Sequence, residues 1–220
     1  MAWRLTELCL KCVENNMACF PDLGSLLPVM YQETLIERLT CHDHLYYGPL
    51  QHISKSLFTS ALRHIYLRGC SQVTDEVLQL LGKSGCRLEV LVLSRLNHVS
   101  DIGVQAVTRG QNALLVLEIE LLPLITQQIL TSISSPTLWS FKLVTVRQSP
   151  INPWYTVATL TNFLSQNPAI KVLEMYLDTE HIPLVAKGLN ISLAELTTQY
   201  QTVTDEGIEA LAQFCPNLRT

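Results

Sequence analysis

Residues 62–75, LRHIYLRGCSQVTD, decide the fold, because their pattern returns twice at an interval of 26 residues. Residues 88–101 read LEVLVLSRLNHVSD and residues 114–127 read LLVLEIELLPLITQ, with apolar residues at the first, fourth, sixth and ninth positions. Less regular copies begin at residues 138, 170 and 193. A unit of this length that recurs is typical of a solenoid, in which each repeat packs mainly against its neighbours.

Each unit predicts a short strand followed by a helix. Apolar and variable residues alternate in the first half, so the apolar side chains face inward and the variable ones form an open sheet face. A hydroxyl residue and an aspartate then precede each helical stretch, at Thr74-Asp75, Ser100-Asp101 and Thr204-Asp205. We expect the hydroxyl to cap the helix and the aspartate to favour its dipole. The fold class predicted is α/β, a right-handed horseshoe with about six repeats over residues 62–220.

Residues 1–45 do not follow the repeat, and residues 46–61 form a transition to it. Helical spacing relates the apolar residues Leu5, Leu8, Cys9, Cys12 and Val13, which predict one amphipathic helix. A second helix is predicted to begin near Pro28 and to include Leu35 and Leu39. One interpretation of this helical module is a cap, since the first repeat of a solenoid would otherwise expose the edge of its core.

Composition favours an interaction protein inside the cell. Hydrophobic residues make up 48% of the 220 residues, charged residues 15%, and the net charge is −4, so we expect no nucleic-acid partner. The seven cysteines are an odd set without a preceding signal peptide, which indicates a reducing compartment, cytoplasmic and/or nuclear. No apolar stretch reaches the length of a membrane span, so we expect no membrane association.

The repeats resemble the cysteine-containing leucine-rich repeat, which occurs in F-box and related ubiquitin-ligase receptors. The resemblance covers roughly Leu62 to Thr220 and implies a ribonuclease-inhibitor-like leucine-rich-repeat solenoid. In that family a cysteine at the ninth position ties the loop after the strand to the spine of the repeat. Cys70 fits this position, whereas Leu96 and Leu122 depart from it, so the packing there is expected to be apolar.

The N-terminal module resembles an adaptor-binding segment. The spacing Leu5-x3-Cys9-x3-Val13 is similar to the elongin-binding box, L-x-x-x-C-x-x-x-Φ, and the segment from Leu27-Pro28 to Leu35 looks like the cullin-contacting segment that follows it. The same order of elements occurs in the ZYG/ZER group of elongin–cullin substrate receptors and in the antagonist of mitotic exit network family. An F-box is a third possibility, but Gly48, Pro49 and several histidines interrupt the stretch that would form its last helix.

This resemblance implies a substrate-recognition subunit of a cullin-type E3 ubiquitin ligase, with elongin B/C or a Skp-type adaptor as a partner. The residues expected to bind the adaptor are Leu5, Leu8, Cys9, Val13, Leu27, Pro28 and Leu35. The alternative is a leucine-rich-repeat scaffold or regulator without a link to ubiquitin, in which the N-terminal helices are only a cap.

A protein substrate is expected on the open face of the strands. The candidate residues are His64, Tyr66, Arg68, Val90, Val92, Val116, Glu118, Glu120, Lys142, Glu174 and Tyr176. The tyrosine and the valines predict an apolar patch, and the glutamates favour a basic segment beside it. The alternative is an ordinary solvated sheet face. Residues 147–155, with Trp154 near their end, predict either a contact loop or a cover for the core edge.

Catalysis, cofactors and metals are not expected. The sequence contains no nucleophile elbow, phosphate-binding loop or H-E-x-x-H motif, so an enzyme is not predicted. Cys9-x2-Cys12 and Cys41-x2-His44 have zinc-like spacing, but the first pair lies on the apolar stripe of a predicted helix, where a thiol usually acts as a small hydrophobic group.

Overall fold

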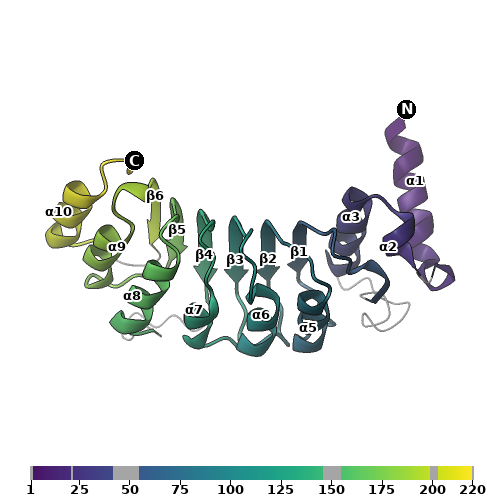
Figure 1. The fold of residues 1–220 in the computed structure, drawn as a ribbon, viewed down its shortest axis with the longest axis horizontal. Helices are drawn as coiled ribbons and strands as arrows, with labels where there is room; N and C mark the ends of the chain where they lie inside the picture. The colour runs from purple at the N-terminus through teal and green to yellow at the C-terminus, as the bar shows by residue number, and fades with distance from the viewer. Residues whose placement is uncertain (1, 21, 42–54, 146–154, 199–202, 220) are drawn as a thin grey trace.

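The computed structural model describes residues 2–20, 22–41, 55–145, 155–198 and 203–219, and it confirms the α/β class. Six strands alternate with helices and form one parallel sheet in the order β1-β2-β3-β4-β5-β6 (Figure 1). The strands are β1 His64–Arg68, β2 Val90–Ser94, β3 Val116–Glu120, β4 Ser140–Val144, β5 Val172–Met175 and β6 Glu195–Thr198.

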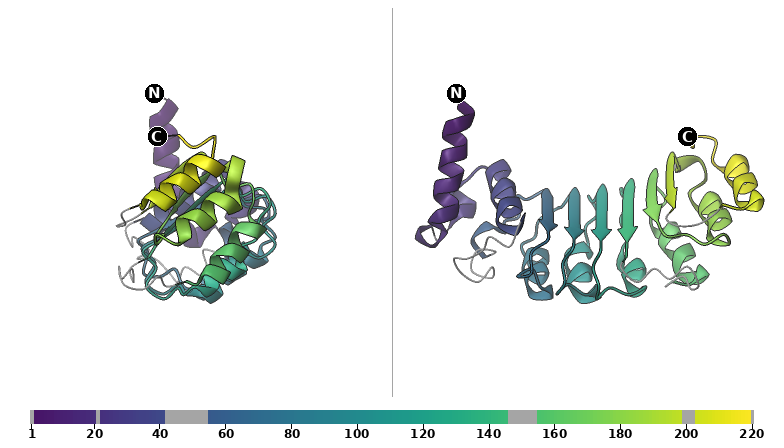
Figure 2. Two further views of the ribbon diagram at one scale, coloured as in Figure 1. Left: turned by 90° about the vertical axis from the view of Figure 1, so that its left-hand side faces the viewer. Right: turned by 180° about the vertical axis from the view of Figure 1, so that it is seen from behind.

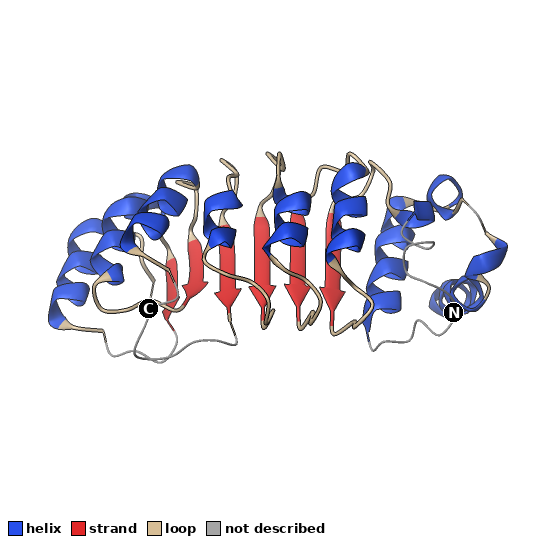
Figure 3. Cartoon of the chain, turned by 90° about the horizontal axis from the view of Figure 1, so that it is seen from below, coloured by secondary structure: helices blue, strands red, loops and turns tan. Residues whose placement is uncertain are grey.

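Helices follow the strands along the chain and lie along one side of the sheet (Figure 3). Their bounds are α5 Asp75–Lys83, α6 Asp101–Thr108, α7 Gln128–Ser132, α8 Val157–Gln166, α9 His181–Leu189 and α10 Asp205–Phe214, with a short 3-10 helix, η3 Asn190–Ser192, after α9. The N-terminal module consists of α1 Ala2–Asn15, η1 Met17–Cys19, α2 Leu23–Leu26 and α3 Val29–Thr40. It lies at the β1 end of the sheet, as the right-hand view of Figure 2 shows.

The register of the sheet follows the 26-residue interval found in the sequence. His64 pairs with Val90, and Val90 pairs with Val116, so equivalent residues of successive units lie side by side. The inward residues of these strands, such as Leu67, Leu93 and Ile119, are fully buried and form a continuous core. Burial of apolar side chains, worth roughly 1.5–3 kcal/mol each, therefore stabilises every unit through its neighbours.

The ninth position of the unit is apolar and buried, as the sequence predicted. Cys70 and Leu96 have no exposed surface and Leu122 retains 1%. A leucine therefore fills the same spine position that the thiol occupies in the first unit.

The aspartates of the repeat do more than favour the helix dipole, because they join consecutive units. The carboxylate of Asp75 accepts hydrogen bonds from the backbone N–H of Ser100 at 2.8 Å, from its hydroxyl at 2.6 Å and from the N–H of Gly103 at 3.1 Å. Asp101 accepts equivalent bonds from the N–H and hydroxyl of Thr126 at 2.9 and 2.6 Å. The carboxylates of Asp75 and Asp101 thus fix the start of the helix that follows in the next unit.

The capping prediction holds for two of the three helices. Ser100 accepts from the N–H of Ile102 and Thr204 accepts from the N–H of Gly207. The prediction is wrong for Thr74, which occupies the N-cap of α5 without a side-chain capping bond. The aspartate position of the unit, held by Asp75 and Asp101, is occupied by Gln127 in the third unit. The buried Oε1 of Gln127 has no hydrogen-bond partner among the described residues. The series of aspartate bonds therefore ends where the sequence departs from the repeat.

Candidate protein-interaction surfaces

Helix α3 seals the free edge of the sheet at β1. One carboxylate oxygen of Glu33 accepts hydrogen bonds from the backbone N–H groups of Arg63, at 2.7 Å, and His64, at 2.8 Å. In the next unit the carbonyl oxygen of Arg63 accepts the same pair of bonds, from Glu89 and Val90. Glu33 therefore stands in the place of the carbonyl group that a preceding unit would supply, and it satisfies an edge that would otherwise be unpaired.

The inner face of α3 belongs to the hydrophobic core. Leu35 has no exposed surface, and Ile36 and Leu39 retain 3% and 8%. The prediction that Leu35 binds an adaptor is therefore wrong for this fold, because the solenoid core uses its whole side chain. Leu27 is half-buried against the same core, while Pro28 is exposed at the N-cap of α3.

Helix α1 is held against α3 by one face only. Leu10 is buried, and Val13 is partly buried against the core, so Val13 is less available than the elongin-box comparison implies. Arg38 of α3 pairs with Glu7 at 2.6 Å and with Glu14 at 3.2 Å. Its hydrogen bond to Glu7 lowers the pKa of that carboxyl group and raises the pKa of Arg38. These contacts fix how α1 is rotated about its own axis.

The opposite face of α1 is apolar and open. Leu8 and Cys12 each lie two residues from Leu10, about 200° around the helix, and Leu5 lies about 140° from it. Leu5 and Leu8 are 68% and 63% exposed, and both cysteines are also exposed. We call Leu5, Leu8, Cys9 and Cys12 the α1 outer face. The helix projects beyond the end of the sheet (Figure 1), in keeping with the exposure of these four side chains.

The predicted substrate-binding residues other than Tyr176, which follows β5, lie in three rows across the open sheet face. The middle row runs from Tyr66 through Val92, Glu118 and Lys142 to Glu174, each paired with the next in register. His64, Val90 and Val116 belong to one flanking row, and Arg68 and Glu120 belong to the other. The sheet therefore brings these residues together on one surface, as the alternation in the sequence predicted.

Two of the predicted surface residues are not accessible. Val92 is 2% exposed, because in its row it lies between the larger Tyr66 and Glu118. Tyr176 is also 2% exposed, and its hydroxyl donates to the carboxylate of Asp178 at 3.2 Å. We correct both assignments: these side chains are packed among their neighbours and offer little contact area of their own.

Charged side chains on the open face are largely paired with one another. The ammonium group of Lys142 lies 2.8 Å from Glu120 and 3.2 Å from Glu174. The hydrogen bond between Lys142 and Glu120 lowers the pKa of Glu120 and raises that of Lys142. At the β1 end, the guanidinium group of Arg68 lies over the ring of Tyr66, with 5.3 Å to its centroid. The acidic character expected from three glutamates is thus reduced by an internal cation.

Several sequence-based interpretations fall outside the structure or find no support in it. His44 and Trp154 lie outside the described residues, as does most of the predicted contact loop, whereas Tyr155 is described and buried. Within the described ranges, His, Cys, Asp and Glu residues form no group of three or more that could hold a metal ion.

Sequence reasoning missed Glu33 and Arg38, since a single charged residue on a helix gives no local sign of a partner about 30 positions away.

None of the helices in the described part of the chain has the length and apolar character needed to cross a lipid bilayer. Comparison of the chain with models of known protein families finds no match, and a search of curated proteins finds no similar sequence.

Proposed function

We propose that this chain is a non-catalytic leucine-rich-repeat protein that recognises a protein substrate for a cullin-type E3 ubiquitin ligase. In this proposal the helices of the N-terminal module bind an elongin B/C or Skp-type adaptor, and the open sheet face binds the substrate. Another subunit transfers ubiquitin. The sheet with its 26-residue register supports the leucine-rich-repeat horseshoe as the fold.

The observation that carries the proposal is the α1 outer face. A cap helix needs one apolar face, and α3 already covers the edge of β1 with Leu35 and Glu33. Helix α1 adds a second layer whose outer face exposes two leucines and two cysteines. Exposed apolar residues that cluster on one helix mark a protein-interaction site more often than scattered ones do. A helix presenting such residues can insert them into a groove of a partner.

The experiment is a pulldown of the full chain against purified elongin B/C and, separately, a Skp-type adaptor. We expect Leu5→Ala/Cys9→Ala to weaken capture at least tenfold, since burial of one leucine contributes about 1.5–3 kcal/mol. Ile191→Ala is the matched control, because Ile191 is 67% exposed, nearly the same as Leu5, and lies in η3 far along the chain.

Three outcomes separate the possibilities. Capture by elongin B/C or the Skp-type adaptor that the α1 variant loses and the Ile191 variant keeps supports the receptor function. Capture that both variants keep removes the α1 outer face from the proposal. If the folded parent chain captures neither adaptor, the chain is a scaffold or regulator without a link to ubiquitin.

A further inference from the structure

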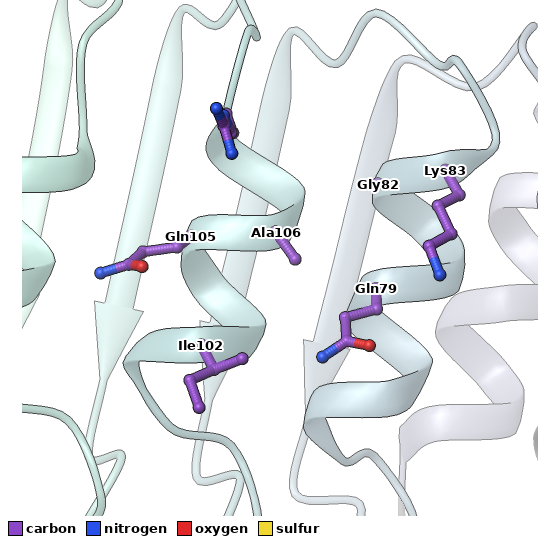
Figure 4. Close-up of a pocket in the computed structure, with 7 residues that line it drawn as sticks. Gln79, Gly82, Lys83, Ile102, Gln105 and Ala106 are labelled. Atoms are coloured by element: carbon purple, nitrogen blue, oxygen red, sulfur yellow. The ribbon is translucent and has the colours of Figure 1, made fainter.

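A groove lies on the helical side of the molecule between α5 and α6, far from the open sheet face (Figure 4). Its volume is about 480 Å³, and it is lined by Gln79, Lys83, Ile102, Gln105, Ala106 and Arg109. Gly82 forms its floor, since a Cβ atom there would lie 2.1 Å from the carbonyl oxygen of Ala106. The two helix backbones therefore touch at Gly82, and the groove opens above this contact.

Polar and apolar groups both line the groove. The α5 side carries Gln79 and Lys83, and the α6 side carries Gln105, Ala106 and Ile102, which is 63% exposed. Figure 4 shows Gln79 and Ala106 pointing into the gap from opposite helices. Arg109 follows the last turn of α6. The two cations thus lie where α5 and α6 end, and the aliphatic groups Ile102 and Ala106 lie on α6.

The polar groups of this groove are available to a ligand. Within the described ranges, the side chains of Gln79, Lys83 and Arg109 make no hydrogen bond or ion pair. Both cations also lie at helix C-terminal ends, where they stabilise the dipole. That role does not explain a free amide and an exposed isoleucine beside them. The chain as a whole has a net charge of −4, so this cationic groove is a local exception that favours an acidic partner.

We propose that the α5–α6 groove binds an extended segment of a partner protein that carries both acidic and aliphatic side chains. The carboxylates of such a segment pair with Lys83 and Arg109, at the end of the groove where both helices end, while its aliphatic side chains pack on Ile102 and Ala106. The amide of Gln79 is placed to bond the peptide backbone. This site is separate from the α1 outer face and goes beyond the proposed function.

The test is fluorescence anisotropy of the full chain with a labelled probe of alternating glutamate and leucine. About six residues suffice, because an extended chain rises roughly 3.3 Å per residue and α6 is only two turns long. Two comparison probes replace leucine with serine or glutamate with lysine. The protein variants are Lys83→Glu/Arg109→Glu, Ile102→Ser and, as a matched charge control outside the groove, Lys55→Glu/Lys171→Glu, whose residues are exposed.

We expect saturable binding of the alternating probe that weakens at least tenfold in Lys83→Glu/Arg109→Glu and in Ile102→Ser, but less than threefold in the control. Equal affinity for the serine probe would overturn the proposal by leaving only general attraction to cations. Equal binding by all variants, or no binding of the alternating probe by folded protein, would also overturn it. None of these results depends on adaptor capture by α1, so the two proposals fail separately.

Discussion

At the scale of single residues, Asp75 and Asp101, which open α5 and α6, act as links between units. Asp75 accepts three hydrogen bonds from the next unit, two of them from backbone N–H groups of Ser100 and Gly103. Gly103 permits this approach, because a Cβ atom there would lie 2.3 Å from the carboxylate oxygen. A larger residue at position 103 is therefore incompatible with the aspartate bond.

We predict that Asp75→Ala lowers the free energy of unfolding by about 2–3 kcal/mol, because two N–H groups and a hydroxyl lose a charged acceptor. Asp205→Ala is the matched control. Asp205 holds the same motif position, but its exposed carboxylate accepts no bond from another described residue, so only a dipole contribution of about 0.3–1 kcal/mol is lost. Urea unfolding measures the free energy of unfolding of both variants. An equal decrease of this free energy in the two variants would contradict the role of Asp75 as a link.

A second residue-scale prediction concerns His181, which is completely buried beside the ring of Tyr155. Its Nδ1 accepts from the N–H of Asp178 at 3.2 Å, so Nε2 carries the proton, and Nε2 has no partner among the described residues. Burial lowers the pKa of this imidazole below its ordinary 6.5, although Asp178 and Glu180 act in the opposite direction. Below pH 6.5 the unfolded chain therefore binds more protons at this imidazole than the folded chain does.

We predict that His181 makes the folded state less stable as the pH falls from about 7 through 6.5 toward the lowered pKa, because the unfolded state then binds more protons. His181→Asn keeps an acceptor for the Asp178 N–H but does not titrate. Unfolding free energies measured at several pH values should fall less steeply toward low pH in this variant. Identical slopes would show that His181 is not protected from protonation.

At the scale of secondary-structure elements, α3 replaces a missing strand. Glu33 bonds two N–H groups of the β1 segment, and the hydroxyl of Thr40 donates to the carbonyl oxygen of Tyr66 at 3.2 Å. A helix can satisfy only a few groups of a strand edge, so this one carboxylate carries much of the backbone pairing at the sealed end.

We predict that Glu33→Ala destabilises the fold by about 2–3 kcal/mol, whereas Glu33→Gln retains most of the stability, because its amide oxygen still accepts from Arg63 and His64. Glu37→Ala serves as a control from the next turn of α3. The carboxylate of Glu37 lies 3.9 Å from Arg68 on the surface, so its loss is expected to cost at most about 1 kcal/mol. Thermal unfolding of the three variants tests this order, and a glutamine variant as unstable as the alanine variant would refute the carbonyl-like role.

The strands could be predicted from the sequence, and the rotation of α1 could not. The strand register depends on local alternation and on the 26-residue interval, both visible in the chain. Two apolar stripes compete on α1, one with Leu10 and Val13 and the other with Leu5 and Leu8. Arg38 decides between them through Glu7 and Glu14, residues that are distant from it in sequence. The burial of Leu35, Val92 and Tyr176 likewise depends on the size and position of neighbours, which alternation does not encode.

At the scale of the whole molecule, the two ends of the sheet are protected differently. The β1 end is sealed by α3, and the inward residues Ile65 and Leu67 are fully buried. At the other end Leu196 of β6 is only partly buried, and α10 exposes Ile208. Because each unit of a stacked array is stabilised by its immediate neighbours, its local stability follows the burial that those neighbours provide.

We therefore predict a gradient of amide hydrogen exchange along the stack, measured peptide by peptide by mass spectrometry. The amides of β3, which has a strand on each side, should exchange slowest, and those of β6 should exchange faster by a factor of about thirty or more, equivalent to roughly 2 kcal/mol of local stability. Glu33→Ala should reduce protection from exchange most in β1, less in β2 and least in β5. Each unit is stabilised by its neighbours, so the loss of local stability at β1 weakens with every further unit. Uniform protection in the parent chain, or an equal reduction in all strands of the variant, would instead identify a single cooperative unit in which the sealed end has no local effect.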